Sequence, residues 1–326
     1  MKCIKCNKDS NKQDRVRNSG RCPSCQHPFV TEPTEDGITD MQIKIAQNEA
    51  SANGTLYFSK AQLKYQLRRK LEKKLKVYKV AALVAALVFF IFLLFALIKG
   101  GVAVVVLSVL SGFIFILTLG TRFKYSNSIN RLDFIMRKWV TINPHEKLLT
   151  DDKYQDNKSS TRNLDGISFE RVLVCERNDT VDFFLSNLFH FHYSCPVLGG
   201  NGYPQGIYED MLTRLKQNPN LKVFLLHDYT PTGYAFVRRM KTDSNWFASL
   251  PPSNIIDLGL NVGQKKLFKS MTIKKTDRNQ KISENAELSL FQPAALVAMC
   301  GAAINEGVPF DLISSASAAD HSNGYG

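Results

Sequence analysis

Four cysteines near the start of the chain have the spacing of a metal site. Cys3 and Cys6 form one Cys-x2-Cys pair, Cys22 and Cys25 form a second, and 15 residues separate the two pairs. This spacing is typical of a zinc ribbon, in which two cysteine pairs bind one tetrahedral Zn2+. The alternative, a pair of disulfides, is disfavoured in a cytoplasmic protein.

The predicted zinc ribbon covers residues 1–30, and we expect its metal to be structural. Four thiolates fill the coordination sphere of zinc and leave no position for a substrate. So short a segment has no room for a hydrophobic core, and the metal must therefore supply most of its folding free energy. His27 follows the second pair and is expected on the surface, not among the ligands.

Two acids in the second half of the chain follow apolar, strand-like segments. Glu176 ends the run Val172-Leu-Val-Cys-Glu176, and Asp228 follows Phe224-Leu-Leu-His227. Ligands bind beyond the carboxyl ends of the strands in an open parallel sheet, so neighbouring strands would bring both carboxylates to one crevice. Paired carboxylates suit Mg2+, which prefers oxygen ligands and bridges to phosphate. Taken singly, each acid is more often a helix cap or a surface charge.

The elements that position these acids alternate regularly between residues 165 and 313. Apolar strands that alternate with helices predict an α/β fold with a mainly parallel sheet and helices on both faces. His227 is expected to face away from Asp228, because successive side chains on a strand point to opposite sides. The strand-like segments are 171–176, 195–198, 222–227 and 255–258, and the helical ones are 178–189, 206–217 and 233–241.

Taken together, these elements resemble the Toprim domain of the DNA topoisomerase VI A subunit and its relatives in meiotic double-strand-break formation. The resemblance covers about residues 171–260. The turn Gly199-Gly-Asn-Gly-Tyr-Pro204 matches the family's Gly-Lys-Gly-Tyr-Pro, and Asp228-Tyr-Thr-Pro-Thr-Gly233 resembles its Asp-x-Asp-Pro-x-Gly. The resemblance implies a Toprim-like, Rossmann-like fold in which Glu176 and Asp228 hold Mg2+ for phosphodiester chemistry. It also implies ligand-binding roles for Gly200, Gly202, Thr230 and Gly233.

The chain departs from this family at two points. Thr230 stands where the second aspartate of the Asp-x-Asp motif belongs, and a hydroxyl binds Mg2+ far less strongly than a carboxylate. Asp257, at the end of the next strand, is the best candidate for a third acid. The cleaving enzymes also carry a winged helix with a nucleophilic tyrosine, for which the juxtamembrane segment 121–164 leaves little room. We therefore do not expect topoisomerase activity.

Two apolar segments predict a transmembrane helical hairpin over residues 80–120. Residues 80–98 and 102–119 are almost unbroken hydrocarbon, and each is close to the ~20 residues that a helix needs to cross a bilayer. Lys99-Gly100-Gly101 between them argues against one long buried helix. Gly112, Ser108 and Ser111 in the second segment would allow close helix packing, and a homo-oligomer through the hairpin is one possible use.

Basic residues predict the orientation of the hairpin. Lys60–Lys79 holds nine Lys/Arg against one Glu, and Thr121–Lys138 holds five against one Asp. The positive-inside rule places both flanks, and with them both termini, in the cytoplasm. The net charge is +13, but residues 165–313 hold 15 bases and 15 acids, so the excess lies outside that domain. Anionic lipid headgroups account for most of it.

The remaining segments have less specific patterns. Residues 31–79 are predicted to be a linker and a basic amphipathic helix. Its leucine stripe could lie on headgroups, pair with a neighbouring chain or pack on the protein's own cytoplasmic part. Lys265–Lys281, with seven bases against Asp277, is either a phosphate-contacting loop or, the favoured reading, a solvated face. Residues 314–326 are expected to be a disordered tail. The leucine stripe is Leu63, Leu67, Leu71 and Leu75.

The leading hypothesis is a membrane-anchored cytoplasmic protein with a degenerate Toprim-like domain that binds nucleic acid, a nucleotide or a protein partner. One alternative is an active Mg2+-dependent nuclease or phosphotransferase that uses Glu176 and Asp228. The other is a structural membrane scaffold that recruits partners through its zinc ribbon. Zn2+ and Mg2+ are the cofactors that these readings imply, and the lipid bilayer is the common partner.

Overall fold

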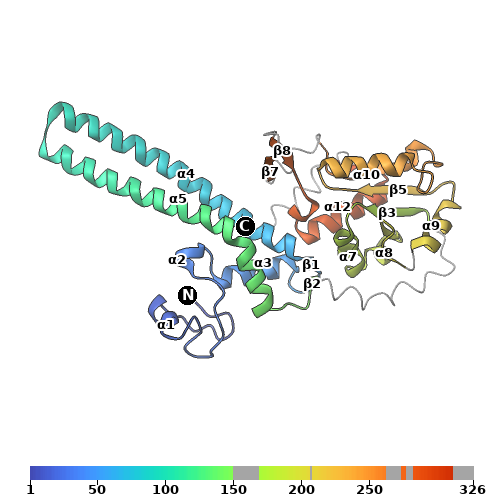
Figure 1. Cartoon of the computed structure of the whole chain (residues 1–326), viewed down its shortest axis with the longest axis horizontal. Coiled ribbons are helices and arrows are strands. Elements are labelled where there is room, and N and C mark those ends of the chain that lie inside the picture. Colours follow the sequence, from blue (N-terminus) through green and yellow to red (C-terminus); the bar gives the residue numbers. More distant parts are fainter. Residues whose placement is uncertain (150–168, 206–207, 262–272, 277–281, 311–326) are drawn as a thin grey trace. The chain divides into compact units, whose positions relative to one another are not determined.

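The computed structural model divides into two compact units (Figure 1). One, the hairpin unit, comprises Met1–Glu49 and Leu63–Glu146, and the other, the α/β unit, comprises Ala50–Gln62 and Lys147–Gly326. The predicted tail 314–326 and most of the basic segment Lys265–Lys281 lie outside the described residues. The structure describes residues 1–149, 169–205, 208–261, 273–276 and 282–310.

Two long antiparallel helices dominate the hairpin unit, α4 (Lys60–Lys99) and α5 (Val102–Ile142) (Figure 1). Gly100 joins them at a positive φ of 60°, a conformation that glycine adopts without steric cost. Both helices are long and apolar enough to cross a membrane. Their apolar side chains are largely exposed on the protein, with Leu97 76% and Val102 82% accessible. Such exposure is costly in water and suits a hydrocarbon environment.

The small residues of α5 pack inside the hairpin. A Cβ atom on Gly112 would lie 3.0 Å from the ring of Phe89 on α4. Phe89 also stacks on Phe115, with 6.4 Å between the ring centroids. Ser108 and Ser111 are buried, and their hydroxyls donate to backbone carbonyls of α5. These three small residues therefore serve contact between α4 and α5 of one chain, and oligomerisation through the hairpin would need another face.

The leucine stripe of α4 packs within the chain. Leu63, Leu67 and Leu71 are at most 1% exposed, and the third of the predicted alternatives is thus the one observed. Helix α3 (Asp40–Ala50) joins this core, where Trp139 Nε1 donates to Gln47 Oε1 at 3.2 Å. The predicted linker therefore contains ordered helix, including α2 (Pro33–Asp36). The apolar α5 residues buried in the same unit are Leu132, Ile135, Met136 and Trp139.

A parallel sheet of four strands forms the centre of the α/β unit. Its strand order is β4-β3-β5-β6, and every neighbouring pair is parallel. The prediction of a mixed α/β fold with a parallel sheet is confirmed. The strands are β3 (Arg171–Cys175), β4 (Val197–Gly199), β5 (Lys222–Leu226) and β6 (Ile255–Asp257).

Helices cover both faces of this sheet, and almost every side chain of the central strands is therefore buried. Val172, Val174, Val223 and Leu225 belong to a core shared with α9 (Tyr208–Lys216) and α10 (Pro231–Thr242). The alternate strand side chains point to the opposite face. The helices α7 (Asn178–Ser186), α8 (Phe189–His192) and α12 (Pro293–Glu306) complete the unit (Figure 1).

Two small strand pairs complete the unit. β1 (Phe58–Ser59) pairs in parallel with β2 (Leu148–Leu149), and Tyr57 N donates to Asn187 Oδ1 at 2.8 Å. The end of the predicted linker thus belongs to the α/β unit. β7 (Ile273–Thr276) and β8 (Ile282–Asn285) form an antiparallel pair, which the sequence analysis did not predict.

Filling the space at Gly112 is predicted to destabilise the hairpin. A leucine there must displace the Phe89 ring, and overpacking of this kind costs about 1–3 kcal/mol. Thermal unfolding of α-helix in detergent micelles, followed by circular dichroism, should show a lower midpoint for Gly112→Leu. Gly120→Leu is the matched control on α5, because its Cβ would meet nothing within 4 Å. Equal midpoints for the two variants would contradict the packing described.

Candidate functional site

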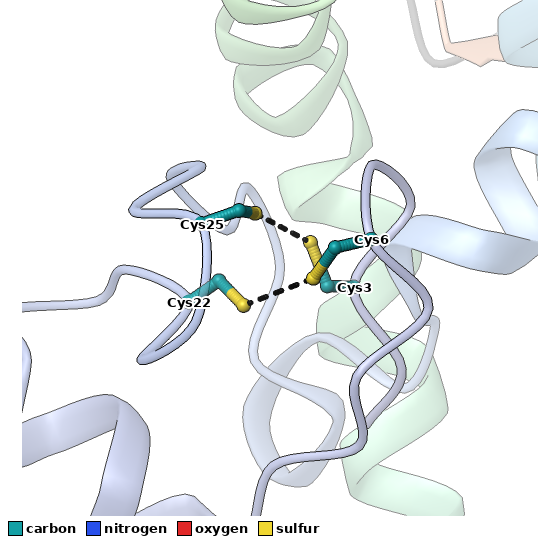
Figure 2. A group of neighbouring side chains, drawn as sticks. All are labelled: Cys3, Cys6, Cys22 and Cys25. Atoms are coloured by element: carbon teal, nitrogen blue, oxygen red, sulfur yellow. Dashed lines mark hydrogen bonds between the residues drawn. The ribbon is translucent and has the colours of Figure 1, made fainter.

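The four N-terminal cysteines come together from two loops of nearly identical geometry. In the first, Asn7 N donates to Cys3 O at 2.9 Å, and in the second, Gln26 N donates to Cys22 O at 2.9 Å. Asn7 and Gln26 both have positive φ, 59° and 57°. Each loop turns its two sulfurs toward the other loop (Figure 2).

The sulfur atoms have the spacing of ligands to one metal ion. All four Sγ atoms lie within 4.8 Å of one another, and the Cys3–Cys25 and Cys6–Cys22 pairs are 3.6 Å apart. Zn–S bonds of ~2.3 Å in a tetrahedron require S–S separations of about 3.8 Å. The donor set therefore fits Zn2+, and the predicted clustering of the four thiols is confirmed. His27 is not a member of this ligand group.

Ionisation of the four thiols requires a cation among them. Burial opposes the Cys22 thiolate, but the N–H groups of Cys25 and Ser24 point at its sulfur and lower its pKa to about 7. The N–H of His27 favours the Cys25 thiolate, but burial and the other three sulfurs raise its pKa to about 12. Thiolates this close repel one another, and a bound Zn2+ removes that repulsion.

The two acids of the α/β unit lie where the strand order reverses. Successive strands run outward from β3 to β4 and then cross back to β5 on the other side of β3. Glu176 follows β3 and Asp228 lies just beyond β5, so they flank the switch point at which open α/β sheets bind ligands. Glu176 Oε2 accepts a hydrogen bond from Asp228 N at 3.0 Å. Glu176 and Asp228 are therefore neighbours, through the carboxylate of one and the backbone of the other, and the predicted crevice shared by both carboxylates stays a prediction.

Asp228 is a buried carboxylate with its own cationic neighbour. Its side chain is 6% exposed, and Arg177 Nη1 lies 3.6 Å from Oδ2. Oδ1 accepts a hydrogen bond from Leu288 N at 2.7 Å. Burial raises the pKa of Asp228 to about 6, against the opposing effects of the Leu288 N–H and the Arg177 charge. The guanidinium of Arg177 also pairs with Asp179 at 2.5 Å.

Thr230 has a structural role at the position where the resemblance expects an aspartate. It is the N-cap of α10, and its Oγ1 accepts a hydrogen bond from Gly233 N at 3.0 Å. Its hydroxyl also lies 2.9 Å from that of Thr232. Side-chain oxygens at an N-cap satisfy otherwise unpaired N–H groups of the first helical turn. This role accounts for Thr230 without a metal ion.

The predicted ligand-binding glycines have packing reasons of their own. A Cβ on Gly200 would lie 2.4 Å from the Phe236 ring, and Gly200 O accepts a hydrogen bond from Arg239 Nη2 at 2.6 Å. Gly202 has a φ of 87°, which favours glycine. A Cβ on Gly233 would lie 2.2 Å from Asp228 O. Gly233 thus lets the start of α10 approach the acid pair closely.

His227 and Asp257 form an ion pair of their own, next to Glu176 and Asp228. His227 is fully buried, its Nε2 lies 3.0 Å from Asp257 Oδ1, and its Nδ1 lies 2.8 Å from Asp228 O. Both neighbours are acceptors, an arrangement that favours the positively charged ring with a proton on each nitrogen. Burial opposes this charge, but Asp257 outweighs it and raises the pKa of His227. Burial likewise opposes the Asp257 carboxylate, but His227 lowers its pKa.

Asp257 therefore pairs with His227 and does not serve as a third metal ligand beside Glu176 and Asp228. Its Oδ1 also accepts a hydrogen bond from Gly259 N at 2.8 Å. Within the described ranges, the cysteines are the only group of three or more candidate ligands with closely spaced donor atoms. The cavity beside Asp228 and Arg177 has a volume of ≈ 30 Å3. That space suits one ion or one to two waters, and a larger ligand would have to lie outside it.

Two groups at this site, Arg177 and Leu288, were missed by sequence reasoning. Arg177 follows Glu176 directly, and a base beside a candidate acid was the available signal. Leu288 contributes only its backbone N–H and comes from a segment 60 residues away in sequence, so no local pattern points to it. His227 was predicted to face away from Asp228, and its side chain does turn to Asp257, while its ring still contacts the Asp228 carbonyl.

The purified full chain is predicted to contain one zinc ion, and replacing any of the four cysteines should release it. Cys22→Ser removes one of four thiolates, which structural zinc sites do not tolerate. Elemental analysis and the charge-transfer absorption of the Co2+-substituted protein measure the effect. His27→Ala is the matched control and should keep both signals. Full zinc occupancy in Cys22→Ser would contradict the four-thiolate site.

The His227–Asp257 pair is predicted to stabilise the α/β unit most between about pH 4 and 6.5. The raised pKa of His227 contributes stability that is fully present below its ordinary value of 6.5 and is lost at higher pH. The lowered pKa of Asp257 contributes stability present above 3.8 and lost as pH falls further. Asp257→Asn should therefore lower the free energy of unfolding by about 3 kcal/mol in this window, and by less at alkaline pH.

Trp246 fluorescence during urea unfolding measures this effect, with Trp139→Phe as the common background, since the chain has two tryptophans. Asp243→Asn, at a half-buried acid just after α10 that has no ion pair among the described residues, is the control and should show no such pH window. A loss that stays constant from pH 5 to 9 would mean that His227 is uncharged.

Models of protein families, curated proteins and solved structures were compared with this chain, and none matches. The Toprim resemblance therefore stays a prediction, and the chemistry of the two sites rests on their geometry.

Proposed function

We propose that this chain is an integral membrane protein with two spans and both termini in the cytoplasm. Its α/β unit is a degenerate Toprim-like domain that binds a Mg2+-bound nucleotide without cleaving it. Its ribbon is held by one structural Zn2+ on Cys3, Cys6, Cys22 and Cys25. The observation that carries the binding role is the pair Glu176 and Asp228 at the switch point, with Arg177 beside them.

The membrane part of the proposal is supported by the exposure of the apolar helices. The 18-residue windows with the highest mean hydropathy in α4 and α5, 3.1 and 2.8, are only 6% and 11% buried within the protein. A core helix of a soluble protein would hide such a surface. The basic flanks on both sides of the hairpin support the cytoplasmic placement of its two ends.

The nucleotide part is supported by charge and by space. Two carboxylates can hold Mg2+, which usually binds proteins through one or two carboxylates plus substrate phosphates. The cavity beside Asp228, which Glu287 lines and Glu176 does not, has room for an ion of this size, and the half-exposed Arg177 at its edge can pair with a phosphate. Residues 165–313 have no net charge, which favours a small phosphate ligand over an extended nucleic acid.

Three observations argue against phosphodiester cleavage. Thr230 caps α10, Asp257 is paired with His227, and Arg177 already neutralises part of the Asp228 charge. Of the acids that the resemblance implies, only Glu176 and Asp228 are available, and two carboxylates hold one metal ion weakly. The active nuclease or phosphotransferase remains the alternative outcome of the experiment below, because the two acids are adjacent. Recruitment of partners by the zinc ribbon is compatible with either outcome.

Binding of a fluorescent ATP analogue to the zinc-loaded full chain in detergent tests the proposal. With Mg2+ present, Glu176→Gln with Asp228→Asn and, separately, Arg177→Gln should each weaken binding about tenfold or more. That loss corresponds to the roughly 1.5–3 kcal/mol of one charged hydrogen bond. Arg238→Gln, an exposed base on α10, is the matched control and should bind normally. The analogue should be recovered intact.

Acidification provides a second measurement on the same protein. Asp228 takes up a proton below about pH 6, so Mg2+-dependent binding should weaken there and the double variant should show no such change. Hydrolysis by the wild type that the double variant lacks would establish the enzyme alternative. Equal binding by all four proteins would refute a nucleotide site at the switch point.

A further inference from the structure

Four basic residues of the hairpin have ion pairs, and all four lie at some distance from the apolar segments. Four cations far from the apolar segments have an acid within 4.0 Å, namely Lys64–Asp133, Arg68–Glu72, Lys70–Glu49 and Arg131–Asp36. Nearer the apolar segments no acid exists to pair with, because neither helix carries Asp or Glu between Glu72 and Asp133. Besides Lys74, whose ammonium lies over the Tyr125 ring, the cations at this boundary are Lys73, Lys76, Lys79, Arg122 and Lys124, here called the collar.

None of the collar residues has an ion pair with any described part of the chain. Four of the five are exposed and Lys124 is half-buried. Five cations gathered on two adjacent helices repel one another, and this repulsion is a cost unless an external anion offsets it. The acids that pair with four cations elsewhere on α4 and α5 thus have no counterpart where the helices become apolar.

An aromatic pair places the collar residues of both helices at one level. Tyr78 on α4 stacks on Tyr125 on α5, with 5.3 Å between ring centroids. Lys79 and Lys124 adjoin these two tyrosines in sequence, and Lys74 Nζ lies 5.5 Å from the Tyr125 ring. Tyrosine is enriched where a membrane helix passes through the headgroup layer. The collar and the tyrosine pair therefore mark the same boundary on both helices.

All five collar residues can reach lipid headgroups. Lys79 directly precedes the apolar run, and Lys73 lies six residues earlier, about 9 Å along a helix that rises ~1.5 Å per residue. That separation is no more than a Debye length of ~8–10 Å at physiological salt. The flexible side chains reach further, because lysine and arginine extend toward the interface.

We propose that the collar is a binding surface for anionic phospholipids, whose phosphates replace the missing acids of α4 and α5. This inference rests on the proposed membrane span and adds to it a preference for negatively charged lipids. Two helices converge on the same headgroups, so the collar recruits several anionic lipids around one hairpin. Each cation near an anionic surface strengthens binding roughly fivefold.

Spin-labelled lipids in nanodiscs that contain the full chain measure this preference. The wild type should select phosphatidylglycerol over phosphatidylcholine severalfold at low salt, and the preference should fall strongly at high salt. Lys73→Gln, Lys76→Gln and Lys79→Gln, combined in one protein, should bring the ratio close to that of phosphatidylcholine. The matched control removes three exposed bases elsewhere, with Lys8→Gln, Arg17→Gln and Arg238→Gln, and should keep the preference.

Insertion is scored separately in nanodiscs of phosphatidylcholine alone. If the wild type does not insert there, the proposed span fails and the collar inference fails with it. If all three proteins insert but select phosphatidylglycerol equally, the collar is overturned while the span stands. Loss of binding to a short oligodeoxynucleotide in the collar variant, with unchanged lipid preference, would also overturn it and assign the cations to nucleic acid.

Discussion

The antiparallel contact between α4 and α5 is the interaction on which the hairpin unit depends. Leucine side chains spaced four apart on α4 meet the apolar face of α5, and Gly112 opens space for Phe89 further along. The ribbon and the two short helices that follow it are then attached to this pair by polar contacts. Lys138 donates to Phe29 O and Val30 O, both at 3.4 Å, and Arg131 pairs with Asp36. Asp40 accepts the N–H groups of Val30 and Thr31.

In the α/β unit the decisive constraint is the burial of charge. A buried carboxylate is tolerated only when hydrogen bonds or an opposite charge offset its lost hydration. The buried Asp228 has Leu288 N–H and Arg177, and the half-buried Asp257 has His227 and Gly259 N–H. The groups that offset the lost hydration of these carboxylates also take up their oxygen atoms as hydrogen-bond or ion-pair partners. This explains how a pair of acids at a ligand-binding edge can belong to a domain proposed to bind without cleaving.

Much of this architecture was predictable because it follows from local pattern. The cysteine spacing predicted the four-thiol cluster, the strand–helix alternation predicted the parallel sheet, and the two apolar runs predicted the long helices. Contacts between segments distant in sequence were not predictable. Leu288 meets Asp228 through its backbone, and the packing of α3 against Trp139 depends on the path of the chain. The role of Thr230 was missed because a threonine in a metal motif and a threonine at an N-cap look the same in sequence.

The length of α5 has a mechanical consequence. Its 41 residues extend about 60 Å, roughly twice the ~30 Å hydrocarbon thickness of a bilayer. In the proposed membrane span, only half of the paired helices is immersed, and the other half is a stiff stalk. Because the ribbon is fixed to this stalk and not to a loop, its height above the bilayer would then be set by helix length. If the immersed half tilts, the rigid helices would carry the ribbon with them and displace it relative to the bilayer.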